Sequence, residues 1–470
     1  MEDGSRRPDT LDVDHRLPGQ ATAPLGNSRN PTGILSRIGA RAGATNRPRE
    51  QRADNRPRSP WTGLFSVLGY PNARRYYAAV FLSFTVQAIQ LLTRGWLIQR
   101  DTGAPFLVAL VPVMMMGPSL FLSLFGGVLA DRVQRKRIMV VSEIANMACY
   151  AALALLFLAG ELATWQILGI TMINGVSTAF SMPARQAMVA GLVKRHEVPV
   201  AIGMQAVVFN FSQIIGPGLA GLMISTAGVG TALVLSTFLI LPVLFLYARL
   251  QAGPGDVHAR RAEPIIRNLV VGLRYVATDP TLRWLLALGS VVTLTMATWQ
   301  ALLPTIADEI LHGGAGLLGT LGLAGGIGGL VGAFLIAGAG SRIPYVKLEV
   351  IAAFAWAAAI SLFAISPIVA ISITIAIAIG ITRELFFATN FGAFQLSTTD
   401  EFRGRVMAVR GVMFGLQPVG ALVLGALAEL VGVRWALIGV AGAGVIAVIA
   451  VQFLAYSSRV ATSGTSASQS

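Results

Sequence analysis

The chain has 470 residues, of which 54% are hydrophobic and 12% charged, and its mean hydropathy is +0.67. Soluble domains carry about 25% charged residues, so this composition excludes an ordinary soluble protein and indicates a chain that folds in a lipid bilayer. The formal net charge of +14 would fit a nucleic-acid partner only if the cations formed one patch. The single cysteine, Cys149, lies in an apolar stretch and excludes a disulfide framework or a cysteine metal site.

Residues 1–70 are rich in Arg, Pro, Gly and Asn and contain few apolar side chains. Because so few apolar groups cannot offset the entropy lost on ordering, we predict a disordered cytoplasmic tail here and a second disordered tail over residues 457–470. The N-terminal tail lacks the apolar core of a secretory signal. It is either a functional basic arm or the product of an over-long gene start.

Twelve stretches between these tails are apolar over about 20 residues, the length that crosses a bilayer as a helix. A polar stretch at 251–281 separates six spans in residues 71–250 from six in residues 282–456. Within it, apolar residues from Ile265 to Val276 recur at helical spacing, which predicts an amphipathic helix on the inner membrane surface. The sequence therefore predicts an all-α membrane protein of two pseudo-symmetric six-helix halves joined by a cytoplasmic linker. The predicted spans are 76–98, 104–130, 138–159, 163–191, 200–226, 228–250, 282–307, 314–340, 348–366, 367–395, 406–431 and 433–456.

The cations between these spans lie in alternate loops. The loop after the second span carries Arg135, Lys136 and Arg137, whereas the loops of the opposite side carry little beyond Arg100 and Arg434. Since Lys and Arg accumulate in cytoplasmic loops, this asymmetry predicts that both termini are cytoplasmic. Such short loops cannot form a basic surface for nucleic acid, so we exclude that partner.

The loop GVLADRVQRKR joins the second and third spans and combines one acid with four cations. It resembles motif A of the major facilitator superfamily, G-x-L-A-D-R-x-G-R-[KR], with Gln134 in place of the second glycine. The resemblance implies that the acid helps to latch the cytoplasmic side in the outward-open state. The alternative is a positive loop that only sets orientation. The candidate gating residues are Gly127, Asp131, Arg132, Arg135 and Lys136, with Arg185 of the fourth span as a further partner.

The fifth span resembles motif C, G-x8-G-x3-G-P-x2-G-G, which occurs in exporters of the same superfamily. Proline removes a backbone hydrogen bond and small residues let helices approach, so this span is predicted to bend and to pack closely. An ordinary kinked membrane helix is the alternative. Pro418 of the eleventh span occupies the equivalent position in the second half, as expected of a repeat transporter. The candidate hinge and packing residues are Gly203, Gly216, Pro217, Gly221 and Pro418.

Polar residues recur at helical spacing on the first and fourth spans, which places each set on one helix face. The resemblance implies that the first, fourth, seventh and tenth spans line a central cavity, so these faces are candidates for substrate contact. Hydrogen bonding between helices is the alternative. The seventh span adds a mildly polar, aromatic face. The candidate cavity residues on these three spans are Ser83, Gln87, Gln90, Arg94, Asn174, Ser177, Thr298 and Trp299.

Two adjacent charged residues, Arg383 and Glu384, lie near the middle of the tenth span, with Asn390 two turns further on. A charge at this depth costs about 2.5–3.5 kcal/mol, so each side chain should face a partner or a wet cavity. We predict that Arg383 and Asn390 contact substrate and that Glu384 exchanges a proton, because burial favours the neutral carboxyl.

Several further segments resemble the bacterial branch of the superfamily that contains the enterobactin exporter and drug and macrolide efflux proteins. They include GWLIQRDTGAP, SMPARQAMVAGLV, GLRYVATDPTLR and EFRGRVMAV. The resemblance implies a multi-pass efflux protein of the bacterial inner membrane that works by alternating access. We therefore expect a proton antiporter that exports a small amphiphilic molecule of drug or siderophore type.

The sequence contains no Walker A motif, metal-ligand cluster or nucleophile elbow. We therefore expect no enzyme activity, cofactor or metal, and transport energised by an ion gradient. The expected partners are a small-molecule substrate, protons and the lipid bilayer, and we expect a monomer. An importer or facilitator of a polar nutrient, and a non-transporting membrane receptor that uses the basic tail, remain as alternatives.

Overall fold

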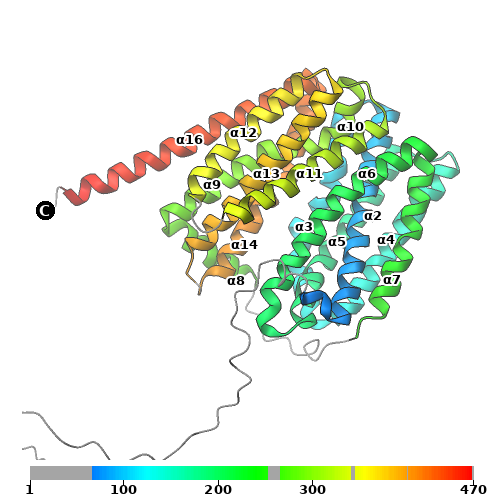
Figure 1. The fold of residues 1–470 in the computed structure, drawn as a ribbon, viewed down its shortest axis with the longest axis horizontal. Coiled ribbons are helices and arrows are strands. Elements are labelled where there is room, and N and C mark those ends of the chain that lie inside the picture. The colour runs from blue at the N-terminus through cyan, green and yellow to red at the C-terminus, as the bar shows by residue number, and fades with distance from the viewer. Residues whose placement is uncertain (1–65, 252–264, 340–343, 400, 468–470) are drawn as a thin grey trace, which may run out of the picture. The chain divides into compact units, whose positions relative to one another are not determined.

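The computed structural model describes residues 66–251, 265–339, 344–399 and 401–467. Within these ranges the structure does not describe every side chain. The side chains left out are those of 265–268, those of 456–467 and several near 123–132, including Gly127, Asp131 and Arg132. So does most of the predicted N-terminal tail. Every regular element that the structure describes is a helix (Figure 1).

The first half contains six long helical passes. Pro71 and Pro105 stand at the first turns of α2 and α3, where a missing N–H is tolerated. Gly103 ends α2 with a φ of 59°, a left-handed conformation that favours glycine. The elements are η2 (Val67–Gly69), α2 (Pro71–Thr102), α3 (Pro105–Arg132), α4 (Arg135–Leu158), α5 (Thr164–Leu192), η3 (Arg195–Glu197), α6 (Val198–Phe238) and α7 (Ile240–Ala248).

The second half begins with the predicted amphipathic helix. Asp279 caps the next helix, since its Oδ1 accepts hydrogen bonds from the N–H groups of Thr281 and Leu282 at 2.7 and 3.1 Å. The elements are α8 (Ile265–Thr278), α9 (Pro280–Thr295), η4 (Met296–Leu302), α10 (Leu303–Thr305), η5 (Ile306–Ile310), α11 (Ala315–Ala339), α12 (Tyr345–Ile365), α13 (Val369–Leu396), α14 (Arg403–Phe414), α15 (Gln417–Val431) and α16 (Val433–Ala467).

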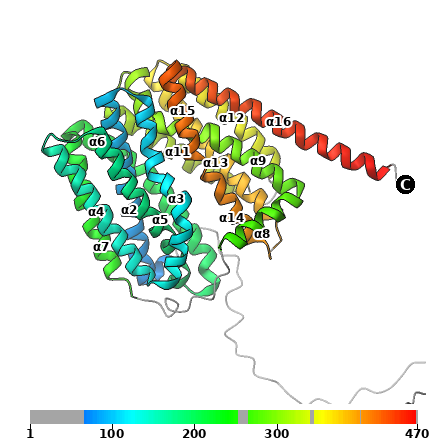
Figure 2. The ribbon, with the colours of Figure 1, turned by 180° about the vertical axis from the view of Figure 1, so that it is seen from behind.

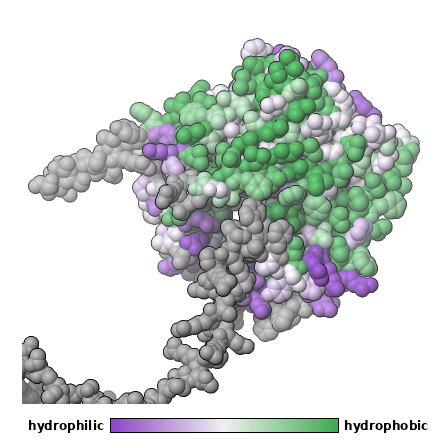
Figure 3. All heavy atoms as spheres, viewed as in Figure 1, coloured by the Kyte–Doolittle hydropathy of each residue, from purple (hydrophilic) through white to green (hydrophobic). Residues whose placement is uncertain are grey.

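The described chain has 11 helical segments long and apolar enough to span a membrane, one of which runs over 51 residues from Val198 to Ala248. At 1.5 Å per residue that segment is far longer than the roughly 30 Å hydrocarbon core. It bends back at Gly228, whose φ of 84° and ψ of 167° are not helical, and so forms two passes. The predicted twelve-helix fold is thereby confirmed, and apolar side chains cover most of the helical surface in Figure 3.

Three details differ from the sequence-based boundaries. Val67, placed in the N-terminal tail, is fully buried against the first half. The seventh span passes through a 3-10 segment and a π segment, and the eleventh is interrupted between Phe414 and Gln417. The backbone of α16 stays helical to Ala467, through most of the predicted C-terminal tail.

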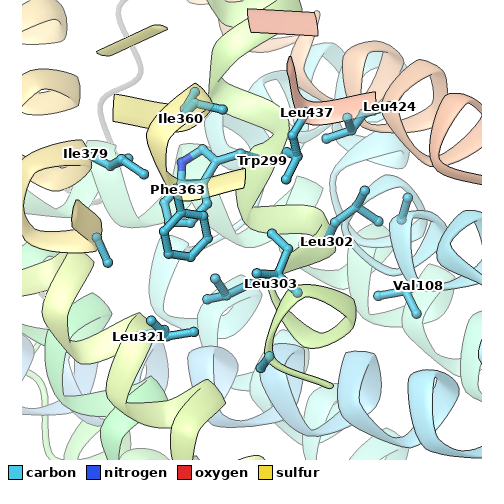
Figure 4. Close-up of a cluster of buried hydrophobic side chains, with 14 of the residues drawn as sticks. Val108, Trp299, Leu302, Leu303, Leu321, Ile360, Phe363, Ile379, Leu424 and Leu437 are labelled. Carbon is cyan, nitrogen blue, oxygen red and sulfur yellow. The ribbon is translucent and has the colours of Figure 1, made fainter. Parts of the chain in front are cut away.

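The two halves meet along two pairs of helices, α6 with α11 and α3 with α15 (Figures 1 and 2). We call this contact the seam. Its close approaches include Gly221 with Gly319 and Gly425 with Ala109, near the end of the bundle that holds residues 103–104 and 311–314. They continue further along the helices through Gly326 with Ile214 and Gly415 with Leu120. A buried apolar cluster continues the seam into the interior, and Figure 4 shows Trp299, Leu302 and Leu303 within it, with Val108 of the first half nearby.

Candidate functional site

The charged loop between α3 and α4 is tied to neighbouring helices through its cations. The half-buried Arg135 donates from Nη1 to the carbonyl oxygen of Ala187 in α5 at 2.9 Å. Lys136 donates from Nζ to the carbonyls of Ala248 and Leu250 at 2.7 and 2.8 Å, at the C-terminus of α7. These carbonyls carry the negative end of the helix dipole, so the two cations stabilise the helix ends they contact.

Three of the predicted gating residues lie at the end of α3. The backbones of Gly127, Asp131 and Arg132 are in its last two turns, while their side chains are outside the described part. The latching role of Asp131 therefore stays a prediction.

Arg185 makes a buried ion pair within the first half. Its Nη2 lies 2.5 Å from Oε1 of Glu143 in α4, and both side chains are at most 5% exposed. Ser83 of α2 joins the pair, donating to Glu143 at 2.6 Å and accepting from Arg185 at 2.9 Å. The acid that pairs with Arg185 in the structure is thus Glu143. The sequence analysis had proposed Arg185 as a further partner of Asp131.

Arg94 is fully buried among neutral polar groups. It donates to Gln90 Oε1 at 3.3 Å, Thr171 Oγ1 at 3.2 Å and Asn174 Oδ1 at 2.6 Å. The ring of Tyr150 lies 5.5 Å from the guanidinium carbon, a cation–π distance. Three oxygens and one ring therefore solvate this charge in place of water.

The Arg94 group and the Glu143 group are joined through amide side chains. Asn174 Nδ2 donates to Asn146 Oδ1 at 3.0 Å, and Asn146 Nδ2 donates to Glu143 Oε2 at 3.4 Å. Ser177 donates to the carbonyl of Ser142 at 2.9 Å. Gln90, Arg94 and Asn174 thus contact one another directly, whereas Ser83 and Ser177 contact α4 at Glu143 and Ser142.

Gln87 differs from the other polar residues of α2 because it is only half-buried. Its Nε2 donates to Oγ1 of the half-buried Thr178 at 3.3 Å, a weak contact that leaves hydrogen-bonding capacity for a ligand.

Thr298 and Trp299 lie in the buried 3-10 segment of the seventh span. Thr298 donates to the carbonyl of Thr295 at 2.8 Å. Trp299 packs edge-on against Phe363, with ring centroids 5.5 Å apart, and its indole nitrogen has no hydrogen-bond partner among the described residues. In this conformation both are buried, and Trp299 belongs to the apolar core beside the seam (Figure 4).

Arg383 and Glu384 are half-buried on α13, on the side packed against α11. A Cβ added at Gly329 would lie 3.4 Å from Nη2 of Arg383, and one at Gly332 would lie 2.9 Å from Cβ of Glu384. The glycines of α11 therefore make the space that both residues occupy. The two opposite charges act on each other electrostatically, and neither side chain has a hydrogen bond to another described residue.

Asn390 belongs to a second buried group that the sequence analysis missed. Its Nδ2 donates to Oε1 of Glu349 in α12 at 2.8 Å, and its Oδ1 accepts from Nε of Arg410 in α14 at 2.9 Å. Glu349 is fully buried and Arg410 half-buried. The sequence did contain a signal for this group, because Glu349 and Arg410 are charged residues inside predicted spans.

Two of the predicted hinge residues, Pro217 and Gly221, lie in the seam. Gly216 faces α2, where a Cβ would lie 2.5 Å from that of Ala88. Pro217 contacts Gly322, and Gly221 contacts Gly319, both in α11. Pro418 starts α15 directly after the break in the eleventh span, and Gly203 lies early in α6.

Polar contacts also cross between the halves, at the end of the bundle that holds residues 103–104 and 311–314. Gln99 of α2 accepts from Thr305 at 2.7 Å and donates from Nε2 to Asp308 at 3.2 Å and Glu309 at 3.1 Å. Glu429 of α15 accepts from the N–H of Phe106 at the start of α3, at 3.4 Å. The first half offers neutral donors here and the second half offers acids.

Residues 63–469 match the family model described as "Transmembrane secretion effector". The chain belongs to this family. It is therefore a multi-pass transporter of the major facilitator superfamily rather than an enzyme, as the sequence motifs predicted.

Three relatives of known role share about a quarter of their residues with this transporter. It is 25% identical to the multidrug efflux pump Tap of Mycolicibacterium fortuitum, covering 74% of this chain and 86% of the pump. It is 22% identical to the staphyloferrin A transporter of Staphylococcus aureus, covering 76% and 90%. It is also 22% identical to macrolide efflux protein A of Streptococcus pyogenes, covering 74% and 89%.

Solved structures support the same fold at lower identity. The nucleoside transporter NupG aligns with a TM-score of 0.63 at 14% identity, over 81% of this chain and 98% of NupG. A bacterial homologue of the human lysosomal transporter Spinster, in an inward-facing and unoccupied conformation, aligns with a TM-score of 0.64 at 15% identity, over 82% and 97%.

Proposed function

We propose that this transporter is a proton-coupled exporter that moves a small amphiphilic molecule out of the cell by alternating access. The observation that carries the proposal is the seam, where the halves touch through glycines, with Gly221 against Gly319 near one end of the bundle. Contacts of this kind, made by backbone and small residues, let the helices of the two halves approach closely. The likeness of the fifth span to the exporter motif supports outward transport.

The orientation follows from charge. The loops with Arg135 and Lys136 lie at the opposite end of the bundle from the seam. If these cations face the cytoplasm, the seam faces outwards and the structure corresponds to a state that loads substrate from the cytoplasm.

In this scheme the loop with Asp131, Arg132, Arg135 and Lys136 closes the cytoplasmic side when the seam opens. Arg135 and Lys136 are already docked on the ends of α5 and α7, which holds the loop in place for that contact. Asp131 would then bind a partner on the second half only in the outward-open state.

Half-buried polar groups are the proposed substrate contacts, namely Gln87 on the first half and Arg383 on the second. Glu384 is the proposed proton exchanger. Its support is its position beside Arg383 at the glycine face of α11, with no hydrogen bond to another described residue. The fully buried polar residues of α2 and α5 would hold Gln87 in place.

The names of the relatives guide the choice of cargo. They are a multidrug efflux pump, a macrolide efflux protein and a staphyloferrin A transporter, and these names indicate small molecules of drug or siderophore type. We propose a cargo of that class.

The test uses inverted membrane vesicles energised by respiration, with internal pH monitored while ethidium, erythromycin and a hydroxycarboxylate siderophore are added one at a time. Proton-coupled export predicts alkalinisation with at least one compound in wild type. It also predicts loss of that signal in Asp131→Asn and Glu384→Gln. Asp101→Asn is the matched control because Asp101 is exposed and, among the described residues, pairs with its neighbour Arg100.

An unchanged signal in Glu384→Gln would refute the assigned proton exchanger. Accumulation in right-side-out vesicles in place of inverted ones would show an importer. Removal of residues 1–60 should leave the signal intact, whereas a tail-dependent receptor would lose its response.

A further inference from the structure

The second half contains a buried carboxylate whose hydrogen bonding is incomplete. From its geometry we propose that Glu349 is a second proton-binding site of the transport cycle and that Arg410 is its counter-charge. This inference rests on the proposed function for its role in transport, but the protonation itself can be tested without any cargo.

The contacts of Glu349 involve only one of its two carboxyl oxygens. Oε1 accepts the hydrogen bond from Asn390 at 2.8 Å, while Oε2 has no partner among the described residues. The residue is 0% exposed. An ionised carboxylate has about four acceptor positions, so its charge would here be solvated by one amide.

Glu143 in the first half provides the contrast. It is equally buried, but Oε1 contacts both Arg185 and Ser83, and Oε2 accepts from Asn146. A buried ion is tolerated when an opposite charge and hydrogen bonds replace water, and Glu143 has both. Glu349 has neither a direct cation nor a second donor, so the observed contacts fit a neutral carboxylic acid.

Arg410 is close to Glu349 but is held away from it by Asn390. Its Nε donates to Asn390 Oδ1 at 2.9 Å and its Nη2 donates to the carbonyl of Phe387 at 3.2 Å. The rings of Phe391 and Phe414 lie 5.1 and 5.4 Å from the guanidinium carbon. Asn390 therefore separates the acid from the cation in this conformation.

Among the described side chains, no other charge near Glu349 can take this role. On its own helix, Lys347 is exposed. The residue of α13 that contacts Glu349 is the neutral Asn390. The neighbouring segment η4 contains no charged residue. The described side chains of α16 include a single charged one, Arg434, which lies at the opposite end of that helix. Arg410 of α14 is the charged group that acts on it electrostatically.

The break in the eleventh span gives this group a means of responding to transport. Arg410 lies one turn before Phe414, the last residue of α14, and α15 packs on α3 of the other half. When the seam opens, α15 moves with respect to α3 and can turn α14. A shift that brings the guanidinium to Oε2 would favour the carboxylate, so the O–H bond breaks and the proton passes to water.

Infrared difference spectroscopy tests the protonation on the purified full-length protein in lipid nanodiscs at neutral pH. Subtraction of the Glu349→Gln spectrum from that of wild type should reveal one carbonyl band of a protonated carboxylic acid. Glu143→Gln should remove no such band. Glu349→Asp should retain a band at a shifted frequency, which shows that the signal comes from this site.

Thermal unfolding provides an independent readout. Glutamine resembles a neutral glutamic acid, so Glu349→Gln should leave the unfolding midpoint unchanged, whereas loss of an ionised partner of Arg410 would lower it. The absence of the carbonyl band, or a lowered midpoint, would overturn the protonated assignment.

Transport by reconstituted protein tests the role in coupling, with ethidium and erythromycin as probes. Glu349→Gln should lose accumulation driven by a pH gradient yet retain downhill equilibration. Accumulation equal to that of wild type would overturn the coupling role. If wild type moves neither probe, the proposed cargo class fails, and the infrared result alone decides whether Glu349 binds a proton.

Discussion

Replacing Gly221 with alanine should push the two halves apart where α6 crosses α11. A Cβ at this position would lie 2.5 Å from Cα of Gly319 and 2.9 Å from the carbonyl oxygen of Ala315. Carbon atoms in ordinary contact are about 3.5–4.0 Å apart, so the helices would have to separate by about 1 Å. The obstacle is backbone, which cannot move aside as a side chain would.

The expected size of this effect follows from the cost of overpacking, about 1–3 kcal/mol. Because the clash exists only while the seam is closed, the cost falls on one state and should shift the equilibrium about 5- to 150-fold towards the open seam. The change should therefore be visible in the populations of the two conformations as well as in stability.

Spin labels at Arg100 on α2 and Leu430 on α15 would report the shift, because both side chains are exposed and belong to different halves. The background variant is Cys149→Ala, since Cys149 is the only cysteine. Pulsed electron paramagnetic resonance should show a longer distance population in Gly221→Ala. Gly439→Ala is the control, because a Cβ there meets nothing within 4 Å. A distance distribution equal to that of wild type in folded Gly221→Ala would refute the reasoning.

Three further substitutions have defined outcomes. Glu143→Gln leaves Arg185 buried without its acid and should reduce the free energy of unfolding by about 3–5 kcal/mol in a thermal assay. In the same assay Asp101→Asn, at an exposed pair, should cost less than about 1 kcal/mol. Equal losses would contradict a stabilising buried pair. Gln99→Ala removes the contacts with Thr305, Asp308 and Glu309. It should shift the equilibrium towards the open seam by about 1–3 kcal/mol, which the spin-label distances would report. Unchanged distances would exclude these contacts as closing interactions. In Arg94→Lys, the lysine ammonium cannot reproduce the three hydrogen bonds that the planar guanidinium makes, so the unfolding midpoint should fall. Arg100→Lys at the surface should leave the midpoint unchanged. Equal midpoints in the two variants would argue against the Arg94 network.

Hydropathy and charge were sufficient to predict the twelve passes, because each span must satisfy its backbone hydrogen bonds within itself and so depends on local sequence. The irregular course of the seventh span was not predicted. Its 3-10 and π segments arise between residues 296 and 310, where packing against α2 and α3 competes with regular helix geometry. Pro304 is a local signal for a break within MATWQALLPTIADEI, because it removes a backbone hydrogen bond, but it does not indicate which turns replace the α-helix.

Side-chain partners were harder to derive than helices. The sequence placed Arg185 and Glu143 on different spans, but their pairing depends on how α4 and α5 rotate against each other. The same limit hid Glu349 and Arg410, which are 61 residues apart in the chain and share Asn390 only through the tertiary fold. Polar periodicity identified Asn390 and Arg94 as unusual residues, yet it could not show which neighbours would solvate them.

The glycine contacts of the seam have a consequence for the surrounding lipid. When α6 separates from α11, the surface that appears near Gly221 and Gly319 is bare backbone with almost no side-chain bulk. Acyl chains that fill this groove would compete with the closed contact. We therefore expect the balance between the two conformations to change with acyl-chain length and packing, so that membrane composition would regulate the rate of transport without a dedicated lipid site.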